Sequence, residues 1–214
     1  MRNLEKDAIE MAARREAILR EGFRLFSEES IESVKMTDVA KAAGIGIATL
    51  YRYYSTKPEL VLAISVDQWS KVIEEEKRSL ALFDPEDKTA AQCLTYFLDR
   101  YIHLFLKHKP LLRFNQNFNI YVIHEKLEAK QMESYIDQIE SIKELYEIIY
   151  EKAQIDGTVK TDMSEEKMFS YILHVMLAVI VRYAQGLVYN GKTEDDMLEE
   201  LELLKSSLLS QFVN

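Results

Sequence analysis

The sequence predicts an all-α protein in which a small N-terminal head of three short helices precedes a larger bundle of six longer helices. Three observations support this prediction. Apolar residues recur at helical spacing, strand-like alternation is nowhere sustained, and only 6 glycines and 3 prolines interrupt the 214 residues. We expect the head in residues 1–56 and the bundle in residues 57–214.

The first helix of the head is expected in the segment REAILREGFRLFSEES. Its residues Ile18, Leu19, Phe23 and Phe26 fall on one side of a helix, and the arginines fall elsewhere. A segment with this pattern buries its apolar side against neighbouring helices. We therefore place the first helix of the head here.

The next two helices are expected on either side of a glycine turn in TDVAKAAGIGIATLYRYY. Thr37 is expected to cap the first of them, and Gly44 to supply the positive φ at its end. Ile45 would pack inside the turn, and Gly46 would open the next helix with Leu50 on its inner face. This is the spacing of a helix-turn-helix, whose second helix can enter a DNA major groove.

Capping residues divide the rest of the chain. Thr56 with Glu59, Asp84 before Pro85, Asp162 with Glu165, and Thr193 are the expected helix starts. Breaks are also expected at Lys109-Pro110 and Asp156-Gly157. These signals predict helices near residues 57–81, 85–108, 111–123, 125–154, 163–189 and 194–212.

Charge and hydropathy restrict the partners and the location. Residues 1–60 carry no net charge, whereas the remainder carries the entire formal charge of -9, so only the head is suited to approach phosphates. The longest apolar run, Val175 to Val181, is far shorter than the roughly 20 residues that span a bilayer. The N-terminus has no apolar signal region. We expect a cytoplasmic protein that does not enter membranes.

The segment from about Arg14 to Leu62 resembles the DNA-binding head of the TetR family of bacterial repressors. The resemblance rests on three linked blocks, TDVAKAAGI, ATLYRYY and STKPEL. It implies that Thr37, Tyr51, Tyr53 and Lys57 contact the phosphate backbone of an operator.

Base reading is expected from the start of the second helix of the motif. Its exposed residues would be Gly46, Ile47, Ala48, Thr49 and Arg52. Polar residues are common in the family where Gly46 and Ile47 stand, and apolar contacts suit thymine methyl groups, so an A/T-rich site is expected. Alternatives remain for several side chains: Arg52 could reach guanine or only a phosphate, Tyr51 and Tyr53 could be packed aromatics, and Arg14 and Arg15 could be phosphate contacts or merely solvated.

The last two predicted helices are rich in apolar residues. Their patterning leaves open whether both serve only the core of the monomer. The resemblance implies instead that they pair with a second copy in a homodimer, which would bind a pseudo-palindromic double-stranded DNA site. It also implies a cavity for a small, largely apolar effector in the middle helices. The apolar residues that would line this cavity, or that would otherwise pack in the core, are Trp69, Phe97, Tyr101, Phe114, Phe118, Tyr121, Tyr135 and Met176. The expected polar anchors of the effector are Arg100, Arg113, Asn117 or His174.

Little in the sequence suggests catalysis, a metal or a cofactor. The four histidines form no HExxH motif or tight ligand pair, and Cys93 is the only cysteine. Glu74, Glu75 and Glu76 are expected to be a solvated helix surface. The predicted function is a TetR-like regulator, most often a repressor, that an effector releases from DNA. Two alternatives are a helical protein that sequesters an apolar compound without binding DNA, and an all-helical enzyme that uses buried His and Tyr groups.

Overall fold

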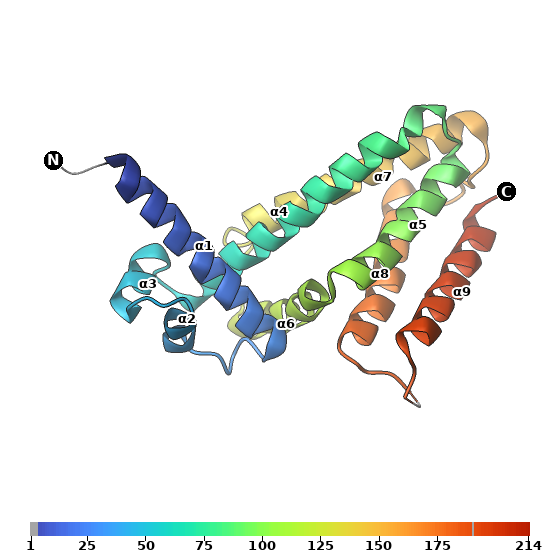
Figure 1. The fold of residues 1–214 in the computed structure, drawn as a ribbon. Helices are drawn as coiled ribbons and strands as arrows, with labels where there is room; N and C mark the ends of the chain where they lie inside the picture. The colour runs from blue at the N-terminus through green and yellow to red at the C-terminus, as the bar shows by residue number, and fades with distance from the viewer. Residues whose placement is uncertain (1–3, 190) are drawn as a thin grey trace. The chain divides into compact units, whose positions relative to one another are not determined.

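The computed structural model describes residues 4–189 and 191–214, and confirms an all-α protein (Figure 1). Among these residues the only β-type pairing is a single bridge between Val159 and Val213. The helices in chain order are α1 (Leu4–Glu28), α2 (Met36–Ala42), α3 (Ile47–Tyr53), α4 (Lys57–Phe83), the 3-10 helix η1 (Pro85–Asp87), α5 (Ala90–Lys107), α6 (Lys109–Glu125), α7 (Glu133–Asp156), α8 (Glu165–Ala184) and α9 (Glu194–Phe212).

The helices form two compact units. The first contains the residues up to Lys71 together with Arg113–Ile136, and the second contains Val72–Leu112 and Asp137–Asn214. This division cuts across the predicted boundary at residue 56, because α4 contributes to both units and part of α6 packs with the N-terminal helices. The placement of the domain boundary stays a prediction.

The core of the first unit is formed by the inner faces of its short helices. Helix α1 comes close to α4 at Gly22, where a Cβ atom would lie 2.6 Å from Cδ1 of Ile64. The absence of a side chain at Gly22 therefore permits this close approach. The fully buried side chains of this core include Ile18, Phe26, Ile31, Val39, Leu50, Leu60 and Ile64.

In the second unit, α5 packs against both α8 and α9. Its start is held by the loop between α7 and α8: the Ala90 N–H donates to Oδ2 of Asp156 at 2.8 Å, and the Ala91 N–H donates to Oγ1 of Thr158 at 3.1 Å. The same loop receives the end of the chain, because the Asn214 N–H donates to the Thr158 carbonyl at 3.1 Å. The loop thus joins the ends of α5, α7 and α9.

Two predicted helix starts in the bundle are displaced by five residues or more. Helix α5 begins at Ala90 rather than at residue 85, because Thr89 caps it through the N–H of Gln92, while residues 85–87 form η1. Helix α7 begins at Glu133 rather than 125, since α6 ends at Glu125 and Lys126 has a φ of 54°.

The bounds of α8 also differ from the prediction, whereas those of α9 agree. Helix α8 covers Glu165–Ala184 rather than 163–189, with Ser164 at its N-cap position in place of Asp162. It ends before Gly186, which has a φ of 75°. The cap at Thr193 and the range of α9 are confirmed, because Thr193 accepts a hydrogen bond from the Asp196 N–H.

Helix α8 is the one described helix that is long and apolar enough to cross a membrane by length and composition, with a mean hydropathy of 1.4. Helices from protein cores pass the same test. Its fully buried residues include Ile172, Met176 and Ile180, whereas Tyr171, His174 and Ala178 are exposed. One side of α8 therefore faces the core of its unit and the other does not.

Candidate nucleic-acid interface

Helices α2 and α3 are joined by a tight turn that follows the predicted geometry. Gly44 has a φ of 67°, and the Ile45 N–H returns to the Ala40 carbonyl at 3.0 Å. Gly46 precedes α3 in an extended conformation, and its carbonyl accepts from the N–H groups of Thr49 at 2.9 Å and Leu50 at 3.1 Å. The turn fixes where α3 begins.

Helix α3 is anchored on one side and open on the other. Leu50 is fully buried, whereas Ile47 and Tyr51 are 37% and 49% exposed. Gly46, Ala48 and Arg52 are also exposed, and Thr49 is half-buried. Arg52 makes no hydrogen bond or ion pair within the described part of the chain, so its guanidinium is available to a ligand. The structure thus brings the predicted base-reading residues onto one short, accessible surface.

Thr37 does not cap α2 as predicted. The helix begins at Met36, two residues earlier than a cap at Thr37 would place it, and Lys35 holds the N-cap position. The Lys35 N–H donates to Oδ2 of Asp38 at 2.8 Å, so a carboxylate takes part in capping the first turn. Thr37 is instead an exposed residue of the first turn of α2. Its contact with a phosphate stays a prediction.

Two of the predicted phosphate ligands already make contacts inside the protein. The Tyr53 hydroxyl donates to the Met11 carbonyl of α1 at 3.3 Å. The Lys57 ammonium donates to the Glu32 carbonyl at 3.2 Å and lies 5.8 Å from the ring centre of Tyr121. Burial lowers the pKa of Lys57. These contacts direct both side chains, and their pairing with phosphates stays a prediction.

The predicted effector-binding residues fall into the two compact units. Three of those in the first unit are in aromatic contact, since Phe114 stacks on Phe118 at 5.9 Å and Phe118 contacts Tyr135 at 4.9 Å between ring centres. Trp69 and Tyr121 are buried in the same unit. The five residues thus belong to one compact unit, and a contact among three of them is seen.

The second unit holds Phe97, Tyr101 and Met176. Phe97 contacts Tyr101 edge to face at 5.3 Å, and it also contacts Tyr146 at 5.0 Å. Tyr146 in turn contacts Phe169 at 5.3 Å. Sequence reasoning missed both Tyr146 and Phe169, because apolar residues at helical spacing indicate burial without indicating which helix they meet.

The phenols of Tyr101 and Tyr146 are unusual within this aromatic group. Both hydroxyls are buried without a hydrogen-bond partner among the described residues. Burial is the largest cause that raises the pKa of each, so both phenols are neutral. Each offers a donor inside an apolar environment, where an unpaired donor is costly.

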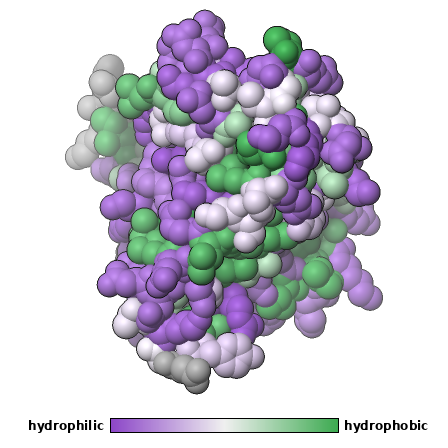
Figure 2. Space-filling view, turned by 90° about the vertical axis from the view of Figure 1, so that its right-hand side faces the viewer, coloured by the Kyte–Doolittle hydropathy of each residue, from purple (hydrophilic) through white to green (hydrophobic). Residues whose placement is uncertain are grey.

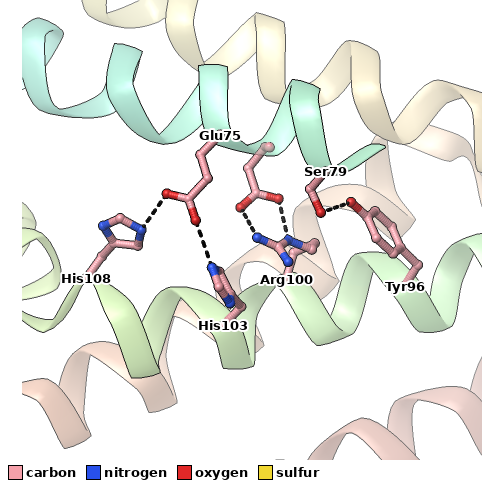
Figure 3. A network of polar contacts seen from close by, with 7 residues as sticks. Glu75, Ser79, Tyr96, Arg100, His103 and His108 are labelled. Carbon is pink, nitrogen blue, oxygen red and sulfur yellow. Dashed lines mark hydrogen bonds and ion pairs between the residues drawn. The ribbon is translucent and has the colours of Figure 1, made fainter. Parts of the chain in front are cut away.

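The acidic run of α4 is only in part the solvated surface that was predicted, because Glu74 is exposed whereas Glu75 and Glu76 have partners on the neighbouring helix. The prediction that no two histidines come together as possible ligands is wrong for His103 and His108. Glu76 binds Arg100 of α5, and Glu75 lies between His103 and His108, as Figure 3 shows. Next to them the Tyr96 hydroxyl donates to Oγ of Ser79 at 2.8 Å. Arg100 is thus engaged with a carboxylate, and its role as a polar anchor stays a prediction.

The other expected polar anchors have partners too. The Asn117 amide donates to the Phe26 and Glu29 carbonyls, both at 2.9 Å, at the end of α1. His174 is exposed and contacts Ser170 Oγ at 3.3 Å. Asn117 therefore has a structural role, and His174 lies on the open side of α8.

Comparison with known proteins agrees with this geometry. Residues 18–64 match the family model described as bacterial regulatory proteins, tetR family. An HTH-type transcriptional regulator from Staphylococcus aureus (strain bovine RF122 / ET3-1) is 44% identical over 57 residues, which cover 27% of this chain and 29% of that protein. A second, from strain USA300, is 42% identical over the same shares. The chain thus matches less than a third of the length of these relatives.

Solved structures resemble the whole chain. A TetR family transcription regulator from Marinobacter aquaeolei VT8 has a TM-score of 0.70 and 19% identity, and the match covers 97% of this chain and 99% of that one. A transcriptional regulator from Saccharomonospora viridis in complex with choline has a TM-score of 0.71 and 17% identity, over 94% and 97%. FadR from Bacillus subtilis in complex with stearoyl-CoA has a TM-score of 0.66 and 14% identity, and the match covers 91% of this chain and 97% of that one. At these identities the likeness establishes the fold.

Proposed function

We propose that this chain is a TetR-like, homodimeric, ligand-responsive repressor of transcription, since its residues 18–64 match the TetR family model and its N-terminal part is similar to HTH-type regulators. The observation that carries the proposal is the asymmetry of α3. Leu50 is fully buried, whereas Ala48, Tyr51 and Arg52 on the same helix are exposed. An exposed short helix held by a glycine turn has the form that reads a major groove.

The charge distribution supports DNA binding by this end of the chain alone. The first 60 residues have no net charge, while the remainder is strongly acidic. Phosphates would repel the acidic remainder, so the protein would approach DNA with its head. Binding to a pseudo-palindromic site then requires two heads, because each reads one half-site.

The dimer is proposed to form through α8 and α9, with support from their composition and exposure. Helix α8 exposes Tyr171 to 42%, and α9 exposes Leu203 to 61%. Figure 2 views the side of the molecule on which α9 lies, and shows apolar patches between hydrophilic residues. Covering such patches with a second copy would remove apolar surface from water.

A small effector is proposed to bind in the aromatic interior of the bundle. The support is the contact of Phe97 with Tyr101 and Tyr146, whose buried hydroxyls could donate to a polar atom of an otherwise apolar ligand. Ligands of structural neighbours differ widely, with choline and stearoyl-CoA among them. The class is therefore proposed only as small and largely apolar.

The test begins with selection of genomic fragments that the full chain retains, followed by fluorescence anisotropy with the selected duplex. We expect salt-dependent binding of one dimer per site, with affinity for the selected duplex at least roughly a thousandfold above that for random DNA. A panel of acyl-CoA thioesters, aromatic acids and quaternary amines is then added to the complex. Equal affinity for every duplex would refute the regulator and favour a sequestering protein.

A further inference from the structure

Three side chains with metal-binding chemistry meet between α4 and the end of α5. Nε2 of His103 lies 2.9 Å from Oε1 of Glu75, and Nε2 of His108 lies 3.1 Å from Oε2 of the same carboxylate. One ligand atom from each of the three lies within 4.8 Å of the others. Figure 3 shows the two imidazoles pointing at the carboxylate, His103 from α5 and His108 from the position that follows its last residue.

We propose that Glu75, His103 and His108 form a binding site for a first-row transition-metal dication, with Zn²⁺ as the reference ion. Two imidazoles and one carboxylate suit this class, whereas Mg²⁺ and Ca²⁺ prefer oxygen ligands alone. The inference concerns a second ligand of the protein and does not depend on DNA binding.

The spacing of the ligand atoms favours coordination. For bonds of about 2.1 Å, tetrahedral or octahedral angles separate neighbouring ligand atoms by roughly 3.0–3.4 Å. The two separations between Glu75 and the imidazoles, 2.9 and 3.1 Å, already lie close to that range. An ion could therefore take the place of these two hydrogen bonds with only small side-chain rotations.

The site is both accessible and held in place. The side chains of Glu75, His103 and His108 are 37%, 28% and 26% exposed, which leaves a path for the ion and room for water to complete its coordination. Glu76, the next residue along α4, accepts two hydrogen bonds from the guanidinium of Arg100 in α5, at 2.6 and 2.7 Å. This pair fixes the register of the two helices and so places the carboxylate opposite the imidazoles.

The nearby cations do not neutralise the proposed site. Arg100 is paired with Glu76, and Lys109, which follows His108, is paired with Glu194. Among the described residues, the ion pairs of the Glu75 carboxylate are those with His103 and His108. A divalent cation would meet one carboxylate and two imidazole nitrogen ligands.

The experiment uses the full chain without a histidine tag, after removal of metal, and titrates it with ZnCl₂ in a buffer that does not chelate. Calorimetry and elemental analysis should give one Zn²⁺ per chain. His103→Gln and His108→Gln should each weaken binding at least about tenfold, since the amide can still donate to Glu75 but is a poor zinc ligand. His174→Gln, which changes an exposed histidine on α8, is the matched control and should bind normally.

A second measurement needs no substitution. In nitrogen-15 spectra of the imidazoles, Zn²⁺ should shift the signals of His103 and His108 and leave those of His124 and His174 in place. Zn²⁺ should also raise Tm of the wild-type chain, because it binds only the folded form. The proposal is overturned if no 1:1 binding occurs, if both Gln variants bind as the wild type does, or if His124 or His174 shifts instead.

Discussion

Arg100 and Glu76 form a two-pronged ion pair between α5 and α4, with Nε to Oε2 at 2.6 Å and Nη2 to Oε1 at 2.7 Å. Both side chains are 20% exposed. Arg100→Lys keeps the charge but loses the fork, so we expect the free energy of unfolding to fall by about 1–2 kcal/mol. Urea denaturation of wild type and Arg100→Lys measures this change in the free energy of unfolding. Lys71→Ala, which breaks an exposed pair with Asp67 within α4, should cost less than about 0.5 kcal/mol.

Asn117 joins α6 to the end of α1 within the first unit. Its amide donates to the Phe26 and Glu29 carbonyls, both at 2.9 Å. Asn117→Ala leaves those carbonyls without this donor and should destabilise the protein by about 1–2 kcal/mol in urea denaturation. Asn119→Ala, at an exposed position of the same helix, serves as the control. Equal effects of the two changes would contradict the assigned role of Asn117.

Asp156 should contribute a pH-dependent part of the stability. Burial raises its pKa, but hydrogen bonds from Thr158 and Ala90 outweigh burial and hold the pKa below the ordinary value. A lowered folded-state pKa means that the contribution is present above the unfolded pKa, about 3.9, and is lost as the pH falls through the folded pKa. Asp156→Asn should therefore cost about 1 kcal/mol at pH 7 and progressively less below about pH 4.

The comparison of wild type and Asp156→Asn is made by urea denaturation at a series of pH values. Asp162→Asn, at an exposed position of the following loop, is the control and should show no such difference. The free energies of unfolding of wild type and Asp156→Asn could instead differ by the same amount down to pH 2. That result would contradict a stabilising role of the carboxylate charge in the hydrogen bonds from the two N–H groups.

Arg52 and Tyr51 should separate sequence reading from backbone binding. Arg52 is exposed without a protein partner in the described chain, and Arg52→Ala should relax the preference at one base pair, worth about 1–3 kcal/mol. Tyr51→Phe removes only a hydroxyl and should weaken all duplexes alike. Anisotropy titrations with selected, single-mismatch and random duplexes distinguish the two patterns. If Tyr51→Phe changes the preferred sequence and Arg52→Ala weakens all duplexes alike, then Tyr51 reads a base and Arg52 binds the backbone.

Ala178 tests the proposed dimer. It is exposed on α8, on the side away from the buried Met176 and Ile180. Ala178→Arg places a charge where a second copy would pack and should yield monomers in light scattering, without loss of helicity. Ile155→Arg, at an 86% exposed position of α7, should leave the assembly unchanged. A dimer that persists in Ala178→Arg would locate the interface elsewhere.

The local features of the fold could be predicted because they depend on neighbouring residues. A glycine at positive φ, such as Gly44, and a capping threonine, such as Thr193, leave a signal within four residues. The error at α2 is of the same local kind: Asp38 reaches back to the Lys35 N–H, so the helix begins before Thr37. A lysine at the N-cap position is not a usual start signal.

The polar cluster could not be predicted from the sequence. Glu75 lies 28 residues from His103 and 33 from His108, so their meeting depends on how α4 packs on α5. A run of three glutamates on an isolated helix looks solvated. The aromatic contact of Phe97 with Tyr146 depends in the same way on tertiary packing, which periodicity does not encode.

Helix α4 runs without interruption from Lys57 to Phe83, and after Pro58 it contains neither glycine nor proline. A helix of this kind bends little, since kinks need such residues or a break in the hydrogen-bond ladder. Glu75, Glu76 and Ser79 therefore keep a fixed spacing along α4, which matches the spacing of their partners His103, Arg100 and Tyr96 along α5.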